Sequence, residues 1–209
     1  KSGLDEKGYL AFFLIVSFII SYLIVKNFGA DLLVNTILIG SALYLFLITV
    51  RDFLKKRLKN FSQNLSHFGF SLLILSILLN NIFSNEIITN LKVGESFKNE
   101  KFEIQFNQLK KFQDKNFISF KGYFLIKENS VSEKLEPELR VYNQPNIVTS
   151  EADIKTTFLT DKFITMNTVQ NEEYFNIRYQ VKPFMLWIWI SVLLISLGGI
   201  ISLLKRKNL

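Results

Sequence analysis

Four long stretches without Asp, Glu, Lys or Arg constrain this 209-residue sequence more than any other feature. They cover residues 8–25, 32–50, 60–85 and 183–204. A helix needs about 20 apolar residues to cross a bilayer, and helices of soluble proteins seldom stay uncharged on every face for so long. Because lipid offers the backbone no hydrogen-bond partners, we expect four transmembrane helices rather than four buried helices of a soluble protein.

The positive charges are distributed unevenly around these four stretches. Basic residues crowd residues 51–59 and 205–207, whereas the turn over residues 26–31 holds one charge of each sign. The positive-inside rule therefore predicts that both termini and the 51–59 stretch are cytoplasmic, and that residues 86–182 form one extracytoplasmic segment.

The outer segment is electrically neutral, although the whole chain carries a net charge of +7. Residues 86–182 hold 14 Lys and Arg residues and 14 Asp and Glu residues, so the basic excess lies on the predicted cytoplasmic side. The net positive charge of the chain therefore reflects its predicted membrane topology. It gives no support to nucleic-acid binding, which requires a basic face on a folded domain.

The chain contains no Cys and a single His, His67. A disulfide framework, a Cys zinc site, a CxxC redox pair and a Cys nucleophile are therefore excluded within the chain. A metal site built from several His residues of this chain is excluded as well. A Ser-His-Asp triad would have to use His67, which the pattern places inside the membrane.

The outer segment has the alternating pattern of half-buried β-strands. Strands are predicted around residues 102–106, 120–126, 139–141, 163–166 and 175–179, and turn signals occur at residues 92–94, 128–130, 143–146 and 170–171. About a hundred residues of this kind favour a small antiparallel sandwich or barrel.

We therefore predict a fold of four transmembrane helices plus a β-rich extracytoplasmic domain. The predicted parts are a two-helix membrane hairpin with a basic cytoplasmic loop (1–60), a third transmembrane helix (61–85), the outer domain (86–182), and a fourth transmembrane helix with a basic tail (183–209).

His67 is the candidate ligand within the membrane. If its helix begins near Phe61, His67 lies about 9 Å along it, at a rise of ~1.5 Å per residue. Ionisable residues inside a membrane are costly and often functional, and a neutral imidazole is a good axial ligand for haem iron. A helical wheel places polar or small side chains, including Gln63, Asn64 and Ser71, on the face of His67. The alternative is an interfacial His that caps the helix or packs against another span.

Three further motifs attract attention. The first is a set of outer residues: Glu138–Tyr142, Glu151–Ile154, Arg178 and Lys182. They either bind a partner or the propionate groups of a ligand, or they are solvated strand residues with surface ion pairs. The aromatic residues of Pro183–Trp189 suit the outer interfacial belt. Gly198 and Gly199 are predicted to let another helix approach closely.

These motifs together resemble the CcmF-type cytochrome c maturation proteins. Leu65-Ser66-His67-Phe68-Gly69 is similar to that family's Leu-Ala-His-x-Gly segment. The run from Pro137 to Tyr142, then Pro145 and Ser150–Ile154, resembles its outer domain. The stretch Arg178–Phe184, with Trp187-Ile188-Trp189 and Leu197-Gly198-Gly199, is similar to its last membrane entry. The order and spacing agree from about residue 60 onwards.

The resemblance implies a membrane subunit of a haem lyase, which attaches haem to apocytochrome c at the outer face of a bacterial or mitochondrial inner membrane. It implies that His67 is one axial ligand of a b-type haem, which keeps the substrate haem iron reduced with electrons from quinol. The second axial ligand comes from outside this chain. Because the chain lacks Cys, thiol-handling partners among the maturation proteins are also implied.

The sequence departs from the family pattern in several places. The family's tryptophan-rich outer motif, its flanking outer histidines and its second membrane His are absent, and Ser66 replaces the usual Ala. The chain begins with Lys1, and we expect it to be the C-terminal part of such a protein or one piece of a split gene. Alone it is not expected to catalyse the ligation.

Two rival hypotheses remain at this point. One is a structural or export membrane protein whose outer domain is a docking platform and which binds no haem. The other is a ResB-type assembly protein with a similar anchored domain.

Overall fold

The computed structural model describes residues 6–28, 31–55, 61–128, 131–169 and 173–207. The predicted turns at 129–130 and 170–171, and residues 56–59 of the basic stretch, lie outside the described residues. The chain divides into two compact units. A helical unit contains the residues up to Ser84, Phe158–Thr160, and the residues from Pro183 onwards; a β unit contains Asn85–Thr157 and Asp161–Lys182.

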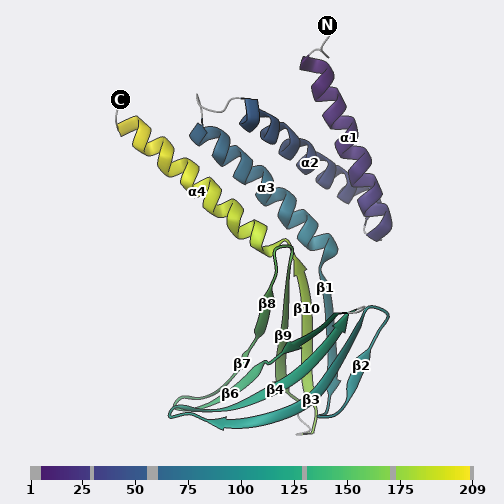
Figure 1. Cartoon of the computed structure of the whole chain (residues 1–209), viewed down its shortest axis with the longest axis vertical. Coiled ribbons are helices and arrows are strands. Elements are labelled where there is room, and N and C mark those ends of the chain that lie inside the picture. The colour runs from purple at the N-terminus through teal and green to yellow at the C-terminus, as the bar shows by residue number, and fades with distance from the viewer. Residues whose placement is uncertain (1–5, 29–30, 56–60, 129–130, 170–172, 208–209) are drawn as a thin grey trace. The chain divides into compact units, whose positions relative to one another are not determined.

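The helical unit contains four helices of membrane-spanning length and apolar composition, as the uncharged stretches predict. Their bounds are α1, Glu6–Phe28; α2, Leu32–Lys55; α3, Phe61–Phe83; and α4, Met185–Lys207. In the order α1, α2, α3, α4, each helix packs against the next, as Figure 1 shows.

Two hydroxyl groups between these helices have partners on the neighbouring helix, as an apolar environment favours, whereas the buried hydroxyl of Thr36 has none among the described residues. Ser21 of α1 donates a hydrogen bond to the carbonyl oxygen of Thr36 on α2, at 2.8 Å. Thr49 of α2 and Ser71 of α3 share a hydrogen bond of 2.7 Å. These contacts connect three successive helices.

Helices α3 and α4 approach closely through glycine. A Cβ atom on Gly198 would lie 2.2 Å from the Oγ of Ser66, and one on Gly69 would lie 3.0 Å from the backbone nitrogen of Ile195. Gly199 is exposed, and no atom lies within 4 Å of its Cβ position. The predicted close approach therefore occurs at Gly198 and not at Gly199.

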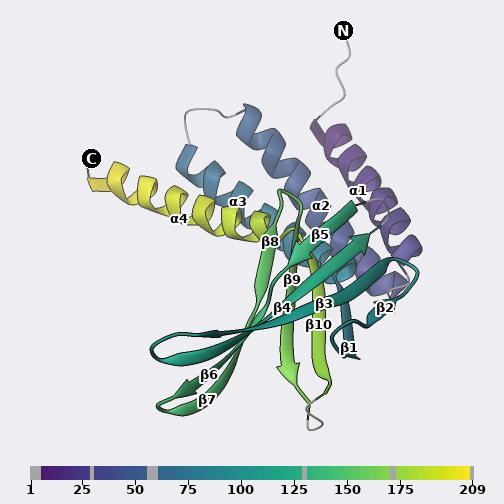
Figure 2. The ribbon, with the colours of Figure 1, turned by 60° about the horizontal axis from the view of Figure 1, so that its bottom comes forward.

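The β unit is an antiparallel sandwich, so of the two predicted architectures the sandwich is the one that forms (Figure 2). One sheet has the order β1 (Asn85–Leu91), β10 (Phe175–Pro183), β9 (Thr160–Thr168), β8 (Asp153–Thr156). The other has the order β2 (Ser96–Lys98), β3 (Phe102–Gln113), β4 (Phe117–Glu128), β6 (Glu138–Asn143), β7 (Asn146–Glu151), and β5 (Val131–Leu135) also pairs with β4.

The core of the sandwich is made of the residues that alternate inward. Phe106 and Phe124 stack with their ring centroids 4.4 Å apart, and the side chains of Ile164, Met166 and Ile177 are fully buried around them. The five predicted strand regions fall within β3, β4, β6, β9 and β10. Each of these five strands buries apolar side chains on one face, and β1, which buries Ile87 and Leu91, does so without being predicted.

Candidate functional site

His67 lies in the second turn of α3, which begins at Phe61, and its side chain is exposed on the outside of the helical unit. Gln63, one turn earlier, is exposed as well. Further along the helix, Phe70 is 53% exposed and Ile77 is 48% exposed. The described residues thus present an imidazole on an otherwise largely apolar helix surface.

The other two polar residues predicted to share the face of His67 are directed into the helical unit. Ser71 is fully buried and donates a hydrogen bond to the carbonyl oxygen of Phe68, at 2.9 Å, besides its contact with Thr49. The side-chain nitrogen of Asn64 is buried and has no hydrogen-bond partner among the described residues. Ser71 is therefore engaged with α2 and its own helix, and only Gln63 stays on the exposed side with His67.

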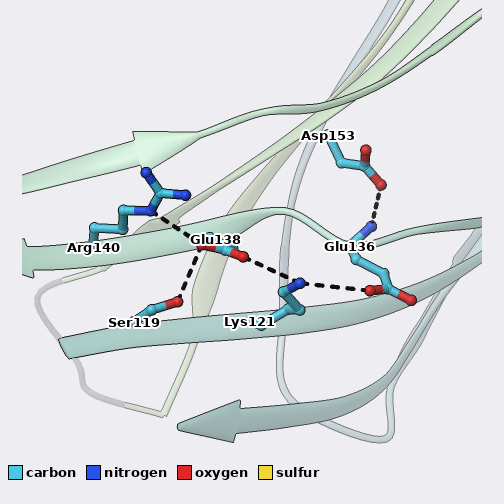
Figure 3. A network of polar contacts seen from close by, with 6 residues as sticks. All are labelled: Ser119, Lys121, Glu136, Glu138, Arg140 and Asp153. Atoms are coloured by element: carbon cyan, nitrogen blue, oxygen red, sulfur yellow. Dashed lines mark hydrogen bonds and ion pairs between the residues drawn. The ribbon is translucent and has the colours of Figure 1, made fainter. Parts of the chain in front are cut away.

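A second candidate site is a cluster of polar residues centred on β4 and β6 of the larger sheet, which we call the Glu138 cluster (Figure 3). Glu136 precedes β6, and Asp153 begins β8 of the smaller sheet. Its members are Ser119, Lys121, Glu136, Glu138, Arg140 and Asp153. In the register of β4 and β6, Lys121 lies opposite Glu138 and Ser119 opposite Arg140. Directly opposed residues in antiparallel strands point to the same face, so the alternation that buries Leu139 also gathers these side chains outside.

Glu138 is the centre of the cluster. Its carboxylate accepts hydrogen bonds from the Arg140 Nε at 3.1 Å and from the Ser119 hydroxyl at 3.2 Å. The Lys121 Nζ lies 3.1 Å from its other oxygen and 3.8 Å from a carboxylate oxygen of Glu136. The guanidinium of Arg140 also lies over the ring of Phe117, 5.0 Å from its centroid.

These contacts shift the ionisation of the cluster. Partial burial by itself would raise the pKa of Glu138, but the hydrogen bonds from Lys121 and Arg140 outweigh it, so that pKa lies below its ordinary value. The hydrogen bond to Glu138 in turn raises the pKa of Lys121. The three groups are therefore charged together at neutral pH.

Two open hollows adjoin the cluster and share Lys121, Glu138 and Arg140 among their lining residues. One, of about 360 Å³, extends to the aromatic rings of Phe112 and Phe117. The other, of about 330 Å³, extends to carboxylates on the opposite side, including Glu151 and Asp153. Asp153 also accepts a hydrogen bond from the backbone nitrogen of Glu136, at 2.6 Å.

The structure brings together only some of the outer residues that the sequence singles out. Glu138, Arg140, Glu151 and Asp153 line the same hollow. Arg178 lies on β10 of the other sheet, where its Nε pairs with a carboxylate oxygen of Glu86 on β1. Lys121 and Ser119 are not among the site residues that the sequence motifs predict, because their pairing with β6 depends on a register that no short motif encodes.

The aromatic motif at the start of α4 is anchored within the helical unit. The Trp187 Nε1 donates a hydrogen bond to the carbonyl oxygen of Phe158, at 3.1 Å, and the two rings meet edge to face with centroids 4.9 Å apart. Trp189 is 62% exposed. This arrangement is consistent with an interfacial role for the motif.

The four membrane-length helices and the antiparallel sandwich define the class as a multi-pass membrane protein that carries a β-sandwich between its last two helices. Residues 82–183 match the family model of the CcmF C-terminal β-sandwich. Residues 82–183 therefore form the CcmF-type C-terminal β-sandwich, which confirms the resemblance of the sequence to the C-terminal part of a CcmF-type cytochrome c maturation protein.

Individual relatives agree with this assignment. The chain is 30% identical to the cytochrome c-type biogenesis protein CcmF of Pseudomonas fluorescens over 146 residues, which is 69% of this chain and 22% of the relative. It is 25% identical to the cytochrome c-type biogenesis protein NrfE of Haemophilus influenzae, over 82% of this chain and 28% of that protein. The chain thus spans between a fifth and a third of the length of these relatives.

A solved structure shows the same fold. The protein titled "Cytochrome c Heme Lyase CcmF" superposes with a TM-score of 0.66 at 17% sequence identity, over 96% of this chain and 35% of that one. The similarity therefore extends over the helices as well as the sandwich.

Proposed function

We propose that the chain acts as a membrane component of a cytochrome c haem lyase, in the attachment of haem to apocytochrome c. The match of residues 82–183 to the CcmF C-terminal β-sandwich carries this proposal. Because the chain spans 22% of the CcmF relative from Pseudomonas fluorescens, the remaining parts of the lyase come from polypeptide outside it. Its own contributions are the four membrane helices and the outer domain.

His67 is the residue that we assign to the cofactor, as one axial ligand of a b-type haem. Its exposed imidazole stands on α3 beside exposed apolar side chains such as Phe70, and such a surface suits a flat porphyrin ring. A bound b-type haem would supply one-electron transfer. The sequence contains no second His, so the second axial ligand and the opposite wall of the pocket would come from outside the chain.

The proposed location is the inner membrane, with both termini in the cytoplasm and residues 86–182 on the outer side. The basic residues at 51–59 and 205–207 support this orientation, because Lys and Arg are enriched in cytoplasmic loops. The proposed partners are haem, apocytochrome c and other cytochrome c maturation proteins. Since the chain has no Cys, a separate thiol-handling subunit must prepare the thiols of the apocytochrome.

Covalent haem staining of c-type cytochromes tests the proposed function. In the source cells, deletion of the coding sequence of this chain should abolish the haem-stained bands on a denaturing gel, while the apocytochromes remain detectable by antibody. Re-expression of the wild-type chain should restore the bands. Normal staining in the deletion strain would show that the chain is not needed for haem attachment.

A further inference from the structure

The sandwich leaves one edge strand, β7, unusually open to pairing. In the described part of the chain, the backbone of β7 pairs with β6 alone, while the Ser150 hydroxyl donates a hydrogen bond to the carbonyl oxygen of Met166 on β9. An antiparallel partner engages the backbone groups of alternate residues, so the remaining N–H and C=O groups of β7 point away from β6. Its six residues, Asn146–Glu151, include exposed Ile147 and Val148, at 49% and 54% exposure.

The other edges of the two sheets are short, carry Lys or lie beside another strand. Strand β2 has three residues including Lys98, and β8 has four residues including Lys155. Strand β5, which pairs with β4, has five residues including Lys134, and the part of β3 beyond its pairing with β2 carries Lys110 and Lys111. Strand β1 lies beside β2. Short edge strands and edge lysines are the usual means of preventing unwanted pairing, and the interior of β7 has neither Lys nor Pro. An apolar edge without this protection indicates a partner strand.

Charges beside β7 restrict which strand it accepts. Glu151 lies opposite Glu138, and the hollow next to them is lined by four carboxylates against the two cations Lys121 and Arg140. These cations already contact Glu138. The excess negative charge at this end of β7 favours a cationic side chain on the incoming strand.

The register gives the spacing of the preferred sequence. Ile147, Thr149 and Glu151 lie opposite Tyr142, Arg140 and Glu138, so all three side chains share the outward face of the sheet. Ile147 and Tyr142 form the apolar end of this face, and Glu151 forms the acidic end four residues further along. A strand added to β7 would therefore place an apolar side chain and a cationic side chain four residues apart.

We propose that the β7 edge and the Glu151 side of the Glu138 cluster form a docking site for an extended polypeptide segment, which adds to the sheet as a further strand and places a Lys or Arg beside Glu151. This deepens the proposed function and rests on it only for the identity of the partner, which would be the unfolded polypeptide that receives haem. Backbone pairing supplies affinity in such strand addition, and side chains supply specificity.

The experiment measures fluorescence anisotropy of labelled nine-residue peptides with the full chain in nanodiscs. The reference peptide alternates Thr and Val, with Leu and Lys four residues apart on one face, and a matched peptide carries Glu instead of Lys. We expect roughly tenfold tighter binding of the Lys peptide, since one partly exposed charge contact is gained and one repulsion is avoided. Glu151→Lys should reverse this preference, whereas Glu100→Lys in the exposed turn before β3 should not.

Two N-methylated forms of the Lys peptide test backbone pairing. Each form carries methyl groups on one alternate set of peptide nitrogens, so each blocks one edge of the extended peptide. Exactly one of the two forms should lose binding. Equal binding of both forms, or an unchanged preference in Glu151→Lys, would overturn strand addition at β7.

The competing occupant is a second copy of the chain. If the chain dimerises in nanodiscs or detergent and Ile147→Lys abolishes the dimer, β7 pairs with itself and the peptide proposal is wrong. Peptide binding is independent of the haem-staining assay, so failure of one does not imply failure of the other.

Discussion

At the scale of residues, the electrostatics of the outer domain converge on Glu138. The carboxylate has contacts with Lys121, Arg140 and Ser119, and its side chain is 21% exposed. Hydrogen bonds to a charged group in a partly dehydrated position stabilise a fold more than pairs on an open surface do. By contrast, the ion pair between Lys92 and Glu173 involves a Glu side chain that is 75% exposed.

Glu138→Gln should therefore destabilise the pairing of β4 with β6. We expect a loss of about 1 kcal/mol, because the neutral amide keeps the shape but loses the attraction to both cations. Hydrogen–deuterium exchange of the β4 and β6 amides in the detergent-solubilised chain measures this loss. Glu173→Gln is the control and should leave exchange unchanged; equal effects of the two substitutions would contradict the central role of Glu138.

The same residue predicts a pH dependence. The pKa of Glu138 is lower in the folded chain than its ordinary value of 4.5. Its stabilising contribution is therefore complete above that ordinary value and is lost as the pH falls through the lowered folded pKa. As the pH falls from about 5 to about 3, the protection of the β4 and β6 amides, expressed relative to the intrinsic exchange rate at each pH, should decrease more in the wild type than in Glu138→Gln. Parallel pH profiles would show that Glu138 is not the titrating group.

At the scale of elements, α3 and α4 approach each other most closely among the helix pairs that meet at a glycine in the described part of the chain. The position of Gly198 against Ser66 and the backbone of Ser62 leaves no space for a methyl group. Small residues at such positions allow van der Waals contact and hydrogen bonding between helices where lipid provides no hydrophobic driving force.

Gly198→Ala should push α4 away from α3, with a cost of about 1–3 kcal/mol from overpacking. Gly199→Ala is a matched control one residue away, since nothing lies within 4 Å of its Cβ position. Thermal unfolding of the purified chain, followed by Trp fluorescence, compares the two variants. A lower Tm for Gly198→Ala alone is expected, and equal Tm values for both would contradict the close packing at Gly198.

The elements also show how far the sequence determines the fold. The helices follow from uncharged length, and strands β3, β4, β6, β9 and β10 follow from alternation because each buries one face. Alternation does not reveal β2, β7 and β8, which are edge strands with mostly exposed side chains. The prediction also misses β1 and β5, although β1 buries Ile87 and Leu91. Alternation also fails at the bulge between Phe106 and Gln108, where β3 continues to Gln113 after a register shift.

The candidate sites show the same limit. The depth of His67 along α3 follows from the predicted helix start at Phe61, which the structure has as well. Its exposure does not follow, because a helical wheel gives relative angles but not which side a neighbouring helix covers. Similarly, the contact between Lys121 and Glu138 depends on the register of β4 and β6, which is set by the burial of whole strands.

At the scale of the whole molecule, the orientation in the membrane is testable because the chain has no Cys. Lys115→Cys, in the exposed turn between β3 and β4, should react with a membrane-impermeant maleimide on intact spheroplasts. Asn208→Cys, after the basic run 205–207, should react only after lysis, because the positive-inside rule keeps that run in the cytoplasm. The opposite pattern would reverse the proposed topology, and the Cys-free wild type is the control.

The most direct test of the account is the reduced-minus-oxidised absorption spectrum of the chain purified from its native membrane with the polypeptides that assemble with it. Replacement of a ligating His by Gly leaves a cavity beside the haem iron that free imidazole can fill. His67→Gly should lose most of the b-type haem signal per protein and regain it when imidazole is added, whereas Asn81→Ala, exposed at the other end of α3, should keep the wild-type spectrum. An unchanged haem signal in His67→Gly without imidazole would contradict the assignment of His67 as a haem ligand.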